Sequence, residues 1–153
     1  MEQTDGLQDL KLLLVDDEER FRTTLTKRML EKKLDVTSLG SGIEALKFIE
    51  GNPVDVIVLD IKMPDLDGIE TLEEIKKIKP GIEVILLTGH GTIDTAIEGM
   101  RLGAYDYLLK PCELEDLLEK INGAYAVKNA RDERLRKAQE RSQLDRLEKS
   151  IRF

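Results

Sequence analysis

The sequence has little cysteine and no long apolar run. Cys112 is its one cysteine, so an internal disulfide is excluded, and the composition suits a reducing compartment. No apolar stretch approaches the roughly 18 residues that a membrane-spanning helix needs. The polar, acidic segment from Met1 to Asp9 lacks the basic-then-apolar order of a signal peptide. We therefore expect a cytoplasmic protein without membrane contact.

The charge is unevenly distributed along the 153 residues, a length that fits one domain with an appendage. The net charge is −7, yet residues 128–153 contain nine Lys and Arg against five Asp and Glu. The first 127 residues therefore carry −11, which argues against broad nucleic-acid binding. We divide the chain into a leader (1–9), a domain (10–125) and a charged helical tail (126–153).

Five segments have the length and composition of β-strands. Three are short, nearly continuous apolar runs, typical of strands buried on both faces of a parallel sheet: Leu12–Val15, Val54–Leu59 and Val84–Leu87. Two weaker candidates are Asp35–Leu39 and Asp106–Leu109.

Apolar residues recur at helical spacing after each of these strands. The helices are expected to begin near Arg20, Ser41, Asp67, Thr92 and Glu113. Ser41 and Glu44 have the spacing of a capping box, and Asp67 is expected to cap the third helix. This alternation predicts an α/β fold: a doubly wound, five-stranded parallel sheet in the order 2-1-3-4-5, with an extended C-terminal helix.

Polar side chains follow four of the predicted strands where each strand ends. Asp16 and Asp17 follow the first strand, Asp60 the third, Thr88 the fourth and Lys110 the fifth. Parallel strands bring their carboxyl ends to one edge, where open α/β sheets bind ligands. We therefore expect these side chains to be neighbours.

Their chemistry suits a phosphoryl group. Three crowded carboxylates repel one another unless a cation lies among them, and Mg²⁺ favours oxygen ligands. The ammonium of Lys110 and the hydroxyl of Thr88 could neutralise and orient phosphoryl oxygens. A carboxylate can attack phosphorus directly, and Asp60 is the best-placed nucleophile because it ends the central strand.

With these residues the chain resembles the response regulator receiver domain of two-component signalling, over about Leu10 to Tyr125. The resemblance rests on four motifs in order along the chain: Leu14–Glu18, Asp60–Gly68, Leu87–Gly91 and Tyr107–Pro111. The stretches Thr88–Gly91 and Ala104–Tyr107 are most similar to receivers of nitrogen-regulation-type sigma-54 activators. No phosphate-binding Gly-x-x-x-x-Gly-Lys-Ser/Thr loop occurs, so we expect a stand-alone receiver or a piece of a longer protein.

The resemblance implies a role for each site residue. Asp60 would accept a phosphoryl group from a histidine kinase or a phosphotransfer protein. Asp17 and Asp60 would bind Mg²⁺ directly, Asp16 mainly through water, and Lys62 would add its backbone carbonyl. The chemistry would be a half-reaction with slow self-hydrolysis, so we do not expect an enzyme in the usual sense.

The resemblance also implies a switch. Thr88 would move toward the phosphoryl group while Tyr107 turns inward. These movements would change the face formed by Thr92–Leu109 and helix five, to which a downstream protein effector would bind. The Lys110–Pro111 bond would be cis, aiming the lysine into the site. His90 would be a rim residue that influences hydrolysis.

Simpler interpretations exist for each residue taken alone. Asp16-Asp17 could be an ordinary helix cap, Thr88 a strand-end hydroxyl and Tyr107 a packing aromatic. His90, the one histidine, could be plain surface, and Cys112 is expected to be incidental at the start of a helix.

Two other functions compete with a phosphorylation switch. A constitutive interaction module would keep the fold without being phosphorylated, but every expected site residue is present. An aspartyl-phosphate hydrolase favours a second carboxylate two residues after the nucleophile as general acid. Lys62 occupies that position and argues against it.

The tail leaves three interpretations open. Its apolar stripe does not keep a clean heptad, so it could be a dimerising helix, a docking helix or a linker remnant. Direct DNA binding ranks last because so short a basic segment has no helix-turn-helix.

Overall fold

The sheet contains the five expected strands, all parallel. The computed structural model describes residues 6–63, 66–89 and 93–151. Its strands are β1 (Lys11–Val15), β2 (Asp35–Leu39), β3 (Val56–Asp60), β4 (Glu83–Thr88) and β5 (Asp106–Leu109). Their order, β2-β1-β3-β4-β5, confirms the predicted topology.

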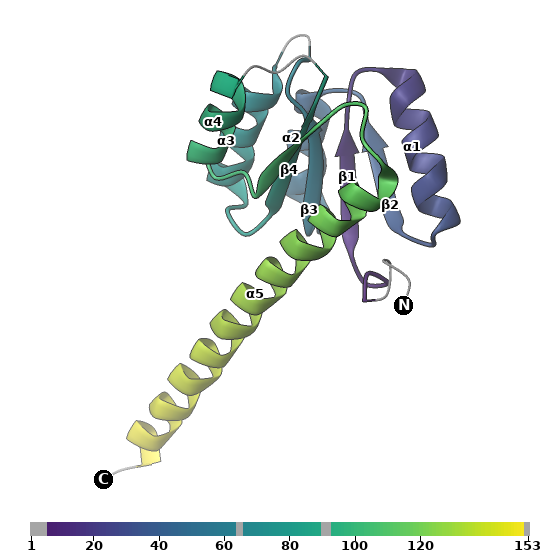
Figure 1. The fold of residues 1–153 in the computed structure, drawn as a ribbon. Helices are drawn as coiled ribbons and strands as arrows, with labels where there is room; N and C mark the ends of the chain where they lie inside the picture. The colour runs from purple at the N-terminus through teal and green to yellow at the C-terminus, as the bar shows by residue number, and fades with distance from the viewer. Residues whose placement is uncertain (1–5, 64–65, 90–92, 152–153) are drawn as a thin grey trace.

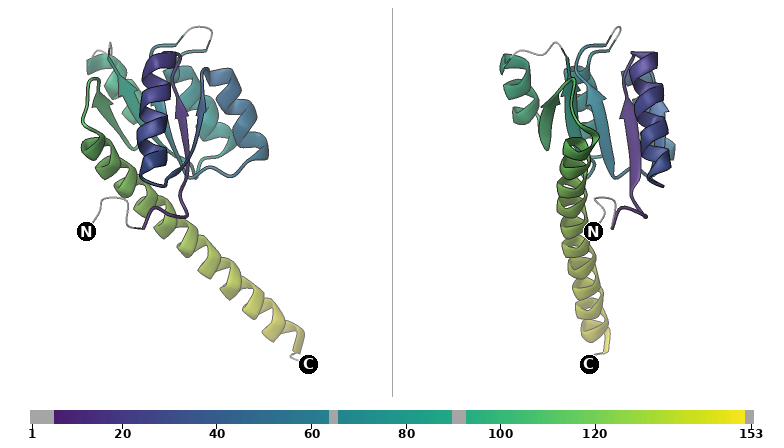
Figure 2. Two further views of the ribbon diagram at one scale, coloured as in Figure 1. Left: turned by 90° about the vertical axis from the view of Figure 1, so that its right-hand side faces the viewer. Right: turned by 45° about the vertical axis from the view of Figure 1, so that its right-hand side comes forward.

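Helices cover both faces of the sheet (Figures 1 and 2). They are α1 (Glu19–Glu31), α2 (Gly42–Gly51), α3 (Gly68–Ile78), α4 (Ile93–Arg101) and α5 (Leu114–Ile151). One apolar cluster joins α1 and α5 to one face of the sheet, and a second joins α2 and α3 to the other. Leu7, within the predicted leader, is buried in the first cluster.

Two helix starts follow the chemistry expected from the sequence. Ser41 Oγ accepts a hydrogen bond from Glu44 N, and the Glu44 carboxylate accepts one from Gly40 N. Asp67 Oδ1 accepts from Glu70 N at 2.8 Å, which confirms Asp67 as the cap of α3. These caps satisfy backbone donors that the first helical turn leaves free.

The apolar stripe of α4 is exposed, unlike those of the other short helices. Ile93 is 79% exposed, and Ile97 and Met100 are also exposed. Small residues make the contact with the sheet instead: a Cβ on Gly99 would overlap Leu86 Cδ1. The apolar spacing therefore predicted the helix correctly, but it did not indicate which side of the helix faces the core.

Helix α5 runs far past the sheet (Figure 1). Its first turns pack on the sheet through the buried residues Leu117, Leu118, Ile121 and Ala124. Every residue from 132 to 151, by contrast, is exposed. We call residues 132–151 the projecting tail. None of the helices described here is long and apolar enough to cross a membrane.

Candidate functional site

The predicted site residues lie together at one edge of the sheet. They come from the carboxyl ends of β1, β3 and β4 and from the segment after β5. Asp16 follows β1, Asp60 and Thr88 are the last residues of β3 and β4, and Lys110 follows β5. The side chains of Asp16, Asp60 and Thr88 are buried, with at most 6% of each residue exposed. Lys110 N donates a hydrogen bond to Thr88 O at 2.8 Å, which extends the β4–β5 pairing into the site.

Three carboxylates lie close enough to share one cation. One oxygen each from Asp16, Asp17 and Asp60 lies within 4.8 Å of the others. Burial and, to a lesser extent, the neighbouring Asp16 carboxylate together raise the pKa of Asp60 to about 7, against the opposing effect of Lys110. Hard oxygen donors under mutual repulsion fit a divalent cation such as Mg²⁺.

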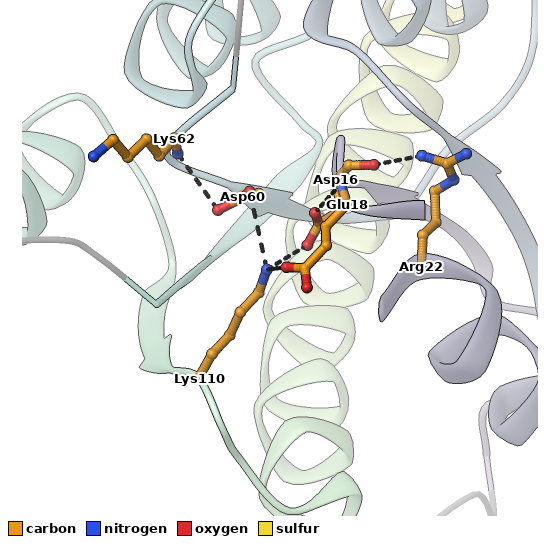
Figure 3. Close-up of polar contacts among 6 residues, drawn as sticks. All are labelled: Asp16, Glu18, Arg22, Asp60, Lys62 and Lys110. Atoms are coloured by element: carbon orange, nitrogen blue, oxygen red, sulfur yellow. Dashed lines mark hydrogen bonds and ion pairs between the residues drawn. The ribbon is translucent and has the colours of Figure 1, made fainter. Parts of the chain in front are cut away.

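Lys110 places its ammonium among the carboxylates of Asp16, Glu18 and Asp60 (Figure 3). Its Nζ lies 2.6 Å from Asp16 Oδ2, 3.9 Å from Asp60 Oδ2 and 3.8 Å from Glu18 Oε2. The buried Asp16 charge is thereby compensated. The peptide bond between Lys110 and Pro111 is cis, as the resemblance implied.

The surroundings of Lys110 contain residues that sequence reasoning missed. Phe21 of α1 lies beneath the ammonium, with 4.1 Å from Nζ to the ring centroid. Arg22 Nη1 donates to Asp16 O at 2.6 Å and fixes the backbone that carries the carboxylate. Both follow the Asp-Asp pair by about one helical turn, a weak signal because most residues in this part of α1 are polar or charged.

The remaining predicted residues lie at the edges of the site or outside the description. Lys62 N donates to Asp60 Oδ1 at 3.4 Å, and its side chain extends away from Lys110 in Figure 3. The Tyr107 side chain is on the surface, 41% exposed. Cys112 is a partly buried free thiol just before α5. His90 lies outside the described residues.

Asp55 lies in the third apolar run yet far from the site. It precedes β3, at the opposite edge of the sheet from Asp60, and Asp55 Oδ2 accepts from Lys11 N at 2.8 Å. Asp55 therefore lies outside the candidate site and bonds to the backbone of β1 instead.

Comparison with known proteins identifies the family. The response regulator receiver domain matches residues 12–122, most of the chain, so this chain belongs to that family. Among curated relatives, Regulatory protein LuxO of Vibrio cholerae is 40% identical over 91 residues, covering 60% of this chain and 20% of that protein. A putative response regulator NtrX-like of Rickettsia typhi is 34% identical over 131 residues, covering 84% of this chain and 28% of that protein.

These relatives agree with the expected likeness to nitrogen-regulation-type regulators, and the chain spans about a quarter of their length. Solved structures agree as well. A response regulator receiver domain protein from Clostridium thermocellum superimposes with a TM-score of 0.75 at 41% identity, covering 79% of this chain and 98% of that one. The beryllofluoride-activated NtrC4 receiver domain dimer gives 0.73 at 37% identity, covering 77% and 98%.

Proposed function

We propose that this receiver domain is a phosphorylation switch in which Asp60 accepts a phosphoryl group from a histidine kinase or a phosphotransfer protein. The observation that carries the proposal is the buried Asp60 carboxylate, within reach of two further acids and 3.9 Å from the Lys110 ammonium. Family membership supports the same activity. A cytoplasmic location belongs to this proposal.

The site residues have distinct tasks in the transfer. Asp16, Asp17 and Asp60, with the backbone carbonyl of Lys62, would hold Mg²⁺, which would neutralise charge on the phosphoryl oxygens. A carboxylate oxygen of Asp60 attacks phosphorus, and the bond from phosphorus to the donor nitrogen breaks. Lys110 exchanges its contact with Asp16 for a phosphoryl oxygen, and the Thr88 hydroxyl donates to another oxygen.

Phosphorylation would then change a surface that another protein can bind. Thr88 ends β4 and is paired with Leu109 of β5, so a shift of Thr88 acts directly on the strand that carries Tyr107. The exposed Tyr107 borders the apolar residues of α4, where a 350 Å³ groove contains Ile93, Ile97 and Met100. We propose that this face, with helix five, binds a downstream protein effector when Tyr107 turns inward.

The division into a leader (1–9), a receiver (10–125) and a tail (126–153) belongs to the same proposal. Exposed apolar residues along the tail, Leu135, Leu144, Leu147 and Ile151, favour a dimerising or docking helix. We do not expect the tail to bind DNA directly. Two expectations rest on the resemblance alone: that His90 is a rim residue that influences hydrolysis, and that the phosphoryl group is lost by slow self-hydrolysis.

Acetyl phosphate tests the proposal without a kinase. The protein is incubated with acetyl phosphate and MgCl₂ and its intact mass is measured, beside Asp60→Asn and a sample with EDTA. We expect one phosphate adduct on the wild type and none on either control. An adduct that persists in Asp60→Asn would assign another acceptor. A wild type that stays unmodified with both acetyl phosphate and a phosphorylated histidine donor would favour the constitutive interaction module.

A further inference from the structure

The amino ends of β3 and β4 hold α5 through acidic residues. Asp55 immediately precedes β3, and its Oδ1 lies 3.2 Å from Lys128 Nζ. Glu83 begins β4, and its Oε1 lies 2.7 Å from Arg131 Nη2. Lys128 also pairs with Asp132 at 2.6 Å, which extends the network along the helix. Two adjacent strands thus bind two adjacent turns of one helix.

These pairs lie where the apolar packing of α5 ends. Ala124 is the last buried residue of the helix, and Lys128 and Arg131 follow it at four and seven residues, on the same helical face. Every residue from 132 to 151 is exposed. Among the residues that the structure describes, these ion pairs are therefore the last to fix α5 to the body.

The Glu83 carboxylate is more deeply buried than the acid of an ordinary surface ion pair. Glu83 is 5% exposed, so its charge is largely removed from water and needs a cation nearby. Arg131 supplies one and also donates through Nη1 to Gly81 O at 3.5 Å. Asp55 is likewise fixed, since its other oxygen accepts the Lys11 backbone N–H. Asp55 is thus held by the sheet as well as by the helix.

A contact at this point strongly affects the position of the far end of α5. The projecting tail has 20 residues, which at about 1.5 Å per residue gives a rod of about 30 Å. A small change in the angle of the helix at its base therefore moves the tip of the tail by several ångströms.

We propose that Asp55 and Glu83 clamp α5 through Lys128 and Arg131 and so fix the direction of the projecting tail relative to the receiver body. The tail is then a rigid extension of the body and not a flexible linker. The opposite ends of the same two strands carry Asp60 and Thr88. The clamp therefore ties the direction of the tail to the strands that build the site. This inference does not depend on phosphorylation.

The test is a distance distribution between two spin labels. In a Cys112→Ser background, Lys27→Cys labels the exposed surface of α1 and Gln143→Cys labels the projecting tail. Labelled protein is diluted with unlabelled protein, so that only distances within one chain are measured. The strand-side variant is Asp55→Asn with Glu83→Gln, and the helix-side variant is Lys128→Gln with Arg131→Gln.

The helix-side variant keeps α5 intact, because Lys, Arg and Gln have similar helix propensities. Arg136→Gln is the matched control, since it removes the pairs with Glu133 and Glu140 inside the tail and leaves the clamp untouched. We expect one narrow distribution for the wild type and for Arg136→Gln, and a broader, shifted one for both clamp variants. A broad wild-type distribution, or clamp variants that reproduce the wild type with unchanged circular dichroism, would overturn the proposal.

Discussion

Asp60 combines burial with the negative charge of its neighbours, and the cost of ionising it is visible in its pKa of about 7. The folded protein holds this proton more tightly than the unfolded chain, in which the pKa lies near 3.8. Stability from this group is therefore complete at low pH and is lost as pH rises from about 4 through 7.

This sign gives a prediction for the metal-free protein. In EDTA, the free energy of unfolding of the wild type should fall by about 2 to 3 kcal/mol between pH 5 and pH 8. Asp60→Asn removes the ionisation and should flatten that fall, making the variant the more stable protein at pH 8. Urea unfolding at both pH values measures the effect. Parallel pH dependences for the two proteins would contradict it.

Lys110 compensates the buried Asp16 carboxylate, so removing it leaves an unpaired charge. Lys110→Met should lower the free energy of unfolding by about 3 kcal/mol in EDTA. Saturating Mg²⁺ should recover part of this loss, because the cation replaces the missing positive charge. Lys77→Met, which removes only exposed pairs on α3, serves as the control and should change stability little. A loss for Lys110→Met that Mg²⁺ leaves unchanged would count against the shared cation site.

At the scale of elements, the turn between β3 and α3 depends on one glycine. A Cβ on Gly68 would overlap the Asp60 carbonyl oxygen and the Ile61 backbone, which cannot move without displacing Asp60. A Cβ on Gly51, at the end of α2, would meet nothing. The two glycines therefore form a matched pair.

Gly68→Ala should destabilise the protein by about 2 kcal/mol or more, the range of overpacked buried sites. Gly51→Ala should be neutral or stabilise by up to about 1 kcal/mol, because alanine favours the helix. Thermal unfolding followed by circular dichroism compares them. Equal effects of the two substitutions would show that the close approach at Gly68 is unimportant.

Element types and order could be predicted from the sequence, but some of their surroundings could not. Short apolar runs predicted the strands because strands buried on both faces need continuous apolar residues. Strand ends predicted that Asp16, Asp60 and Lys110 would meet. The periodicity of α4 could not predict that Ile93 and Ile97 face solvent, because small residues such as Gly99 make the contact with β4. Phe21 and Arg22 were missed because their role depends on how α1 packs beside β1.

At the scale of the whole molecule, the receiver body and the projecting tail share one helix but little packing. The sequence left three interpretations of the tail because its apolar stripe is thin and its charges are mixed. The structure adds that α5 is continuous from Leu114 to Ile151 and that its buried part ends at Ala124.

The receiver body should therefore fold without the projecting tail. A chain ending at Arg131 keeps the clamp and every buried residue, so its free energy of unfolding should stay within about 0.5 kcal/mol of the full chain at micromolar concentration. Chemical unfolding at several concentrations measures this. A full chain that gains stability with concentration while the shortened chain does not would show that the tail associates with a second copy.

Identifying the residue that accepts the phosphoryl group tests the central claim most directly. Borohydride reduces an acyl phosphate on aspartate to homoserine, a permanent mark that peptide mass spectrometry locates by residue. After treatment with acetyl phosphate and Mg²⁺, we expect homoserine at position 60 and unmodified aspartate at positions 16 and 17. Homoserine at position 16 or 17, or none anywhere in protein that carries the phosphate adduct, would contradict the assignment of Asp60 as the phosphoacceptor.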